Sequence, residues 1–336
     1  MSDAAAWGAW QVRPSAFTQR VVDAMKKLYV RGSTVGWLVA DGAVKVPRGA
    51  CGPLVGQRRP AGWQRGGAGA EAPGPGHQRP DVPGRRRRHR AGRQRHRQLP
   101  HVPVLPCQSG KTLLTCAPDP FIFSDLKSIT TKDPQQATLL RLAQAGIAVY
   151  CPHTAVDAAP RGLNAWLADI IAGPHRAARS VAVPCAAAPD AHAPAGYGAL
   201  GRFDAAVPLP EILKRLAARL GGLGHVMVAS PVGADVATTT VRSFGVCAGS
   251  GYDVLRGADV DLLVTGEAGH HSALRAIQQG RTLGQVFHSN SERAYLDGVL
   301  RPRLEEQLRA AVPGAEVVLS EHDKDPFRIV DVGELP

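Results

Sequence analysis

The chain has 336 residues, of which 44% are hydrophobic, and a formal net charge of +12. This length is sufficient for two domains or for one large α/β unit with a sizeable core. No apolar run reaches the roughly 18 residues that a transmembrane helix requires, and the N-terminus lacks the basic segment and apolar core of a secretory signal. These features predict a chain without a membrane partner, located in the cytoplasm or, as the alternative, in the mitochondrion.

The excess positive charge is confined to one part of the chain. Residues 31–110 contain 15 Lys and Arg against 3 Asp and Glu, whereas the remaining 256 residues contain 25 of each. A balanced remainder offers no second basic surface of the kind that nucleic-acid binding requires. We therefore expect no nucleic-acid partner, unless residues 58–97 themselves provide the contact.

The six cysteines, at positions 51, 107, 116, 151, 185 and 247, form no Cys-x-x-Cys pair. Their spacing fits neither a disulfide framework nor a zinc ribbon. We predict free thiols in a reducing compartment.

The first predicted element is an amphipathic helix over residues 16–29. Its apolar side chains recur at helical spacing on one face: Phe17, Val21, Val22, Met25 and Leu28.

Residues 31–115 are rich in Gly, Pro, Arg and Ala and follow neither the helical nor the strand period. Three interpretations are open: a disordered basic linker, a basic patch for nucleic acid or nuclear import, and a GC-rich gene read in the wrong frame or through an intron. The chain therefore divides into an opening helix in residues 1–30, this aberrant basic segment, and an α/β domain in residues 116–336.

Regular patterns return near Pro120. Residues 174–200, rich in Ala and Pro, are expected to form a loop. Helices are predicted over 134–145, 162–172, 209–220, 269–279 and 291–311, and strands over 147–151, 224–229, 240–247, 260–265, 284–287 and 315–320. Strands that alternate with helices predict a layered α/β fold.

The run His288-Ser-Asn-Ser-Glu292-Arg is the first candidate for chemistry. It follows a predicted strand and opens a helix, and the carboxyl ends of strands in α/β sheets commonly face a ligand. An imidazole and a carboxylate at this spacing suit Zn, Mn or Fe. The alternative is structural, because Ser289-x-x-Glu292 is also a capping box.

Three further runs follow predicted strands. His153 and Asp157, in a loop with two prolines, are candidate metal ligands, or else a turn in which Asp157 bonds local backbone. His270, in Thr265-Gly-Glu-Ala-Gly-His-His271, is a candidate for lining the site, although adjacent histidines usually mean one buried and one exposed side chain. The turn from Cys247 to Gly251 could bind an anion through backbone N–H groups, but a tight turn that requires glycine is the favoured interpretation.

Together these runs resemble the Nif-three-like family, whose members bear names such as GTP cyclohydrolase 1 type 2 and NGG-interacting factor homologue. The matching text lies in the family's order over residues 120–330. It comprises Pro-Phe-Ile-Phe-Ser-Asp-Leu-Lys from Pro120, Pro-His-Thr-Ala-Val-Asp from Pro152, Val-Cys-Ala-Gly-Ser-Gly from Val246, Thr-Gly-Glu-Ala-Gly-His-His from Thr265, the run from His288 to Arg293, and Asp-Lys-Asp-Pro-Phe from Asp323.

The resemblance implies a layered α/β/α fold with mixed sheets, a cleft between two lobes that holds two divalent metal ions (Zn, Mn or Fe), and a homo-oligomer. Asp157, His288 and Glu292 stand at the family's ligand positions. Asp119 stands where the family has a histidine before Pro-x-Ile-Phe, which suits a harder ion than a nitrogen-rich site would. The family also has a strand–helix–strand unit where residues 31–115 show no such pattern, which favours the reading-frame interpretation.

From this resemblance we expect a metal-dependent hydrolase that acts on a nucleotide such as GTP, with His153 or His270 as a catalytic proton carrier. The alternative is a regulatory or interaction protein in which the metal is structural. Nucleic-acid binding through residues 58–97 ranks third, because the rest of the chain is electrically balanced.

Overall fold

The structure is a computed structural model. It describes residues 16–28, 37–38, 113–116, 128–185, 188, 190–323 and 325–335. Asp119, residues 58–97 and most of the aberrant basic segment lie outside this part. Of the cysteines, Cys151, Cys185 and Cys247 form no disulfide within the described part, and the side chains of the other three lie outside it. No helix in the described ranges is long and apolar enough to cross a membrane.

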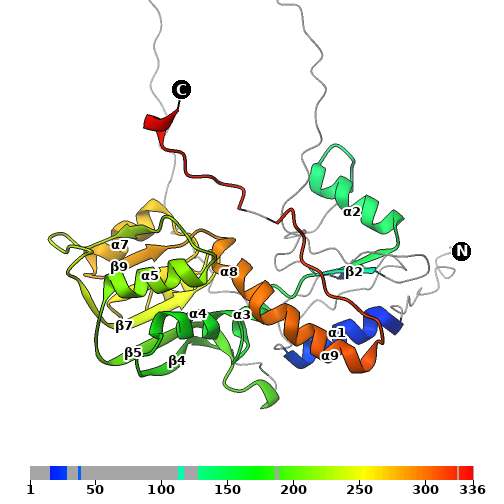
Figure 1. The fold of residues 1–336 in the computed structure, drawn as a ribbon, viewed down its shortest axis with the longest axis horizontal. Coiled ribbons are helices and arrows are strands. Elements are labelled where there is room, and N and C mark those ends of the chain that lie inside the picture. The colour runs from blue at the N-terminus through cyan, green and yellow to red at the C-terminus, as the bar shows by residue number, and fades with distance from the viewer. Residues whose placement is uncertain are drawn as a thin grey trace, which may run out of the picture. The chain divides into compact units, whose positions relative to one another are not determined.

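A six-stranded mixed sheet organises the larger part of the described chain (Figure 1). Its inner strands β7, β8 and β9 run parallel to one another, whereas the strands on either side pair antiparallel. In spatial order the strands are β4 (Ala177–Pro184), β5 (Gly196–Pro208), β7 (Thr240–Cys247), β8 (Leu262–Thr265), β9 (Thr282–Gln285) and β6 (Met227–Ala229).

Both faces of this sheet are covered by helices. Alternate side chains of each strand point to opposite faces, so one strand contributes to two cores. In β8, Leu262 and Val264 pack into the core under α4 (Leu163–Ala172) and α5 (Leu209–Arg219). Leu263 packs into a second core with residues of α6 (Tyr252–Leu255) and α7 (His270–Gln278). The predicted layered α/β/α fold with a mixed sheet is therefore confirmed.

A smaller sheet contains β1 (Trp37–Leu38), β3 (Ile147–Tyr150) and β2 (Leu113–Cys116), in that order. β2 and β3 are parallel, as expected for strands joined through a helix, here α2 (Pro134–Gln144). Asp133 caps α2 by accepting a 2.8 Å hydrogen bond from the backbone N–H of Gln136. β1 and most of β2 fall within the segment in which no regular element was expected.

The C-terminal helix is interrupted by one wider turn. It comprises α8 (Asn290–Tyr295), a π-helical turn (Leu296–Leu300) and α9 (Arg301–Ala311). Its buried stripe is Ser291, Tyr295, Leu300, Leu304 and Leu308. The stripe advances by four residues except from Tyr295 to Leu300, where it advances by five, and a π turn is what keeps that step on one face. Pro302, which has no N–H to donate to the turn before it, explains why the turn widens there.

The opening helix α1 (Ala16–Leu28) packs against α9. Val21, Val22 and Met25 are buried, as the sequence predicts, and the Arg20 side chain donates a hydrogen bond to the carbonyl of Ala311 at the end of α9.

Two expectations for secondary structure were wrong. Residues 174–200 are not a loop, since they contain β4 and the start of β5. Ala and Gly have low strand propensity, but β5 pairs along both of its edges and buries Phe203 and Val207, and such context outweighs propensity. Residues 315–320 are described and form no strand, because no strand of the described part pairs with them.

Candidate functional site

Three loops meet at one edge of the large sheet. β7, β8 and β9 are parallel, so their carboxyl ends lie side by side. Gly249 lies two residues beyond β7, Glu267 two residues beyond β8, and His288 three residues beyond β9. The topology thus brings together residues from three separate runs that the sequence analysis treated as separate candidates.

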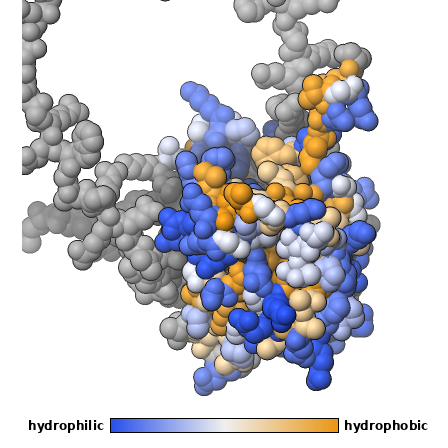
Figure 2. Space-filling model, turned by 90° about the vertical axis from the view of Figure 1, so that its left-hand side faces the viewer, coloured by the Kyte–Doolittle hydropathy of each residue, from blue (hydrophilic) through white to orange (hydrophobic). Residues whose placement is uncertain are grey.

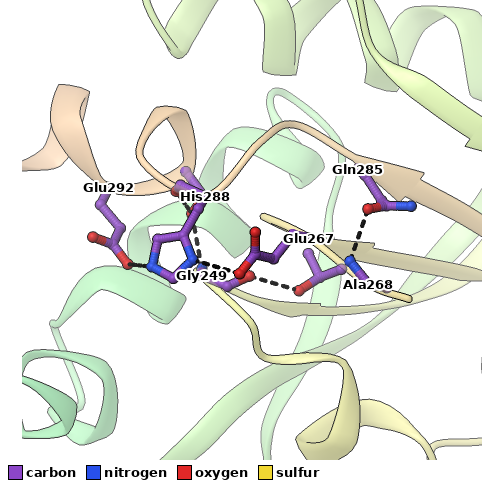
Figure 3. Close-up of polar contacts among 8 residues, drawn as sticks. Gly249, Glu267, Ala268, Gln285, His288 and Glu292 are labelled. Carbon is purple, nitrogen blue, oxygen red and sulfur yellow. Dashed lines mark hydrogen bonds and ion pairs between the residues drawn. The ribbon is translucent and has the colours of Figure 1, made fainter. Parts of the chain in front are cut away.

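The imidazole of His288 lies between two carboxylates (Figure 3). Its Nδ1 is 2.9 Å from Glu267 Oε1, and its Nε2 is 3.6 Å from Glu292 Oε1. The Glu292 side chain is only 13% exposed, whereas that of Glu267 is 52% exposed. The contact with Glu267 is a hydrogen bond, whereas the 3.6 Å between Nε2 and Glu292 Oε1 exceeds hydrogen-bonding distance.

The serine half of the capping box predicted at Ser289-x-x-Glu292 is absent. Ser289 precedes α8, but its side chain makes no capping hydrogen bond. α8 is instead anchored by Tyr295, whose ring meets the edge of Trp166 in α4 at a centroid distance of 5.6 Å. The Glu292 carboxylate lies with Oε1 3.6 Å from Nε2 of His288.

Gly249 provides the floor beneath His288 and Glu292. A Cβ atom at this position would lie 3.2 Å from His288 Nε2 and 3.0 Å from Glu292 Oε1, and the residue has a φ of +58°. Its N–H donates to Ser291 Oγ at 2.9 Å, and that hydroxyl donates to the carbonyl of His288 at 2.6 Å. The N–H of Gly249 is thus occupied within the protein, which supports the tight-turn interpretation over an anion site.

Asp157 and Glu292 act electrostatically on the same buried thiol. Burial raises the pKa of Cys247 to about 12, and the negative charges of Asp157 and Glu292 contribute to the rise. Asp157 lies in the short helix α3 (Thr154–Ala158), which follows β3. Both predicted carboxylate ligands therefore act on the thiol that ends β7.

Asn164 joins α3 to the end of β7, a role that the sequence analysis missed. It is 2% exposed. Its Nδ2 donates to the carbonyl of Asp157 at 3.2 Å, and its Oδ1 accepts from the N–H of Ala248 at 2.9 Å. The sequence does contain a signal for this role, namely a single amide on the apolar face of a predicted helix. A polar group buried there nearly always has a hydrogen-bond partner.

The two histidines predicted as proton carriers have different surroundings. His153 precedes α3 in an unusual backbone conformation, with φ of +43°. His270 begins α7, is exposed, and contacts the ring of His271 edge-on with a centroid distance of 5.6 Å. His270 follows β8, whereas His288 follows β9.

The described residues fit part of a divalent-ion site. No group of three or more His, Cys, Asp and Glu side chains among them converges closely enough to hold an ion. His288 and Glu292 present a nitrogen and an oxygen next to the Cα of a glycine, and such mixed donors suit borderline cations. Asp119, the fourth predicted ligand, lies outside the described residues.

Comparison with known proteins gives one family. Residues 117–326 match the model of Duf34/NIF3 (NGG1p interacting factor 3). The chain is 42% identical over 208 residues to the protein NIF3 homolog of Schizosaccharomyces pombe, covering 62% of this chain and 73% of the relative. It is 36% identical over 214 residues to NGG1-interacting factor 3 of Saccharomyces cerevisiae, covering 62% and 72%.

The crystal structure of a Bacillus cereus protein related to NIF3 has a similar fold. The TM-score is 0.54 at 17% sequence identity, over 65% of this chain and 83% of that one.

Proposed function

The chain belongs to the Duf34/NIF3 family, and from this premise we propose that it is a divalent-metal-binding protein whose site lies at the carboxyl ends of β7, β8 and β9. The observation that carries the proposal is the pair His288 and Glu292, whose Nε2 and Oε1 atoms are 3.6 Å apart over the bare backbone of Gly249. A side chain at position 249 would fill the space in which an ion must lie.

Asp157 and Asp119 complete the proposed ligand set. Asp157 and Glu292 both act electrostatically on Cys247, which supports including Asp157 with Glu292, and Asp119 lies three residues beyond β2, the parallel neighbour of β3. One imidazole and three carboxylates suit Zn, Mn or Fe, and carboxylates are able to bridge two ions. We propose two ions per subunit.

We propose hydrolysis of a nucleotide, with GTP as the first substrate to test, as the activity of this site. A bound divalent ion supplies a water of lowered pKa and stabilises developing negative charge. The chain's own residues hold the ion, and His153, at the amino end of the helix that carries Asp157, is the better-placed of the two proposed proton carriers. His270 is the second.

Substitution of a ligand tests the site. Asp157→Ala and His288→Ala should each remove most of the bound metal from the purified full-length chain, measured by inductively coupled plasma mass spectrometry. Glu306→Ala, which removes an exposed carboxylate from α9, should keep the native metal content. If either ligand variant retains native metal content and a native unfolding midpoint, that residue is not a ligand.

The second candidate is an interaction protein in which the metal is structural. One relative is named as an NGG1-interacting factor. Apolar residues reach the surface of this chain among hydrophilic ones (Figure 2), and the edge strand β6 and the turn after it expose Met227 and Val232 by 53% and 101%. A purified sample that binds metal but hydrolyses neither GTP nor a phosphodiester would favour this candidate. Light scattering would give the number of subunits in that sample.

A further inference from the structure

Glu267 is held in place by both neighbouring strands. Its N–H donates to the carbonyl of Gly249 at 2.9 Å, and the N–H of Ala268 donates to Gln285 Oε1 at 2.7 Å (Figure 3). A Cβ atom at Gly266 would lie 2.6 Å from the Gly249 carbonyl oxygen, so only glycine lets the two loops approach this closely. These contacts fix the backbone position from which the Glu267 side chain extends, whatever its carboxylate contacts.

The carboxylate selects one nitrogen of His288. Glu267 Oε1 is 2.9 Å from Nδ1, whereas Nε2 faces Glu292 Oε1 at 3.6 Å. An ionised carboxylate can only accept a hydrogen bond, so this contact requires that Nδ1 carry the proton of the neutral ring. The lone pair of Nε2 then points to the side on which Glu292 and Gly249 lie.

We propose that Glu267 is a positioning residue that holds His288 in the Nδ1–H tautomer and leaves Nε2 as the atom that binds the metal. This inference rests on the proposed metal site. A partner on the second ring nitrogen fixes the orientation of a ligating histidine and raises its basicity, and loss of such a partner typically weakens metal binding about 10–100-fold. In this proposal Glu267 orients His288, whereas Glu292 binds the ion directly.

The tautomer of His288 is measured first, on the metal-free full-length chain. Nitrogen-15 NMR at pH 8.5, where an imidazole is ordinarily neutral, should show the Nδ1–H form in the native protein. Glu267→Ala should move the ring toward the Nε2–H form. Glu267→Gln should retain the native tautomer, because its amide oxygen still accepts the hydrogen bond. Glu306→Ala, on the exposed face of α9, is the matched control and should leave the spectrum unchanged.

Zinc affinity is measured second, by competition with a chelating dye. Glu267→Ala should bind Zn²⁺ about 10–100-fold more weakly than the native chain, Glu267→Gln should lose less, and Glu306→Ala should match the native chain. The thermal midpoint of each variant should stay near the native value, since Glu267 is half exposed.

Two results would overturn the inference. One is an Nε2–H ring in the native metal-free protein, and the other is native tautomer and native zinc affinity in Glu267→Ala. If the native chain binds no zinc, the proposed function fails, and the role of Glu267 is then decided by the tautomer alone.

Discussion

At the scale of single residues, unusual backbone conformations occur next to the proposed metal ligands. His153 and Phe287 are the non-glycine residues with positive φ in the described part of the chain, at +43° and +69°. One precedes the helix that contains Asp157, and the other precedes His288. Such conformations cost about 1–3 kcal/mol each and are retained where the surrounding structure requires them.

This strain gives a test of His153. His153→Gly and His153→Ala both remove the imidazole, but only glycine adopts positive φ without strain. The free energy of unfolding should therefore be about 1 kcal/mol greater for the Gly variant than for the Ala variant, after allowance for the greater entropy of glycine in the unfolded chain. Urea unfolding measures it. Equal loss of hydrolysis in the two variants would assign that loss to the imidazole, whereas a less stable Gly variant would contradict the strain at this position.

Some site residues could be predicted from the sequence and others could not. The spacing of His288 and Glu292 after an apolar strand indicates chemistry at a strand end. The roles of Asn164 and Ser291 depend on hydrogen bonds to Ala248 and Gly249, which are 84 and 42 residues away in the chain. Local periodicity carries no information on such partners, so their functions become visible only in three dimensions.

At the scale of elements, an ion-pair cluster joins α4 to α5. Arg215 donates to the carbonyls of Ile170 and Ile171, which lie in the last turn of α4, and also to the carboxylate of Glu211. His175 lies 2.7 Å from the same carboxylate. The cluster satisfies carbonyls that a helix leaves without partners at its last turn.

This cluster predicts an acid-dependent part of stability. The hydrogen bond with His175, together with Arg215, lowers the pKa of Glu211 below its ordinary value of 4.5. A lowered folded-state pKa stabilises the fold above pH 4.5 and ceases to do so as the pH falls through that lowered value. Glu211→Gln should therefore be less stable than the native chain at pH 6, and the difference should shrink below pH 4.5 in urea unfolding. A difference that does not depend on pH would contradict this role, and Glu306→Gln is the control.

Helices were predictable where apolar side chains recur at helical spacing. α2, α4, α5 and α7 begin and end within about two residues of their predicted limits. β4 and β5 were not predictable, because their Ala and Gly residues carry little pattern and their stability comes from pairing with distant strands. For these strands the hydrogen-bonded partner, rather than local composition, decides the structure.

At the scale of the whole molecule, the α/β order and the family could be predicted, whereas residues 31–115 give no pattern. The family match begins at residue 117, close to where that segment ends. If the segment results from a wrong reading frame, translation of its genomic DNA in the other two frames should give apolar strands and a histidine before Pro-x-Ile-Phe. Transcript sequencing is the measurement, and absence of both features from both frames would reject the reading-frame interpretation.

The π-helical turn at Leu296–Leu300 bears on how relatives of different length are aligned. A π turn is an α-helix with one residue inserted. A relative that lacks one residue here, and also lacks Pro302, can keep Glu292 at the strand ends and Leu304 in the core on one unbroken α-helix. A one-residue gap elsewhere in α9 would instead rotate everything beyond it by about 100°. Relatives that differ in length within this helix are therefore expected to differ at the π turn. An insertion or deletion there leaves both the site at Glu292 and the packing of Leu304 unchanged.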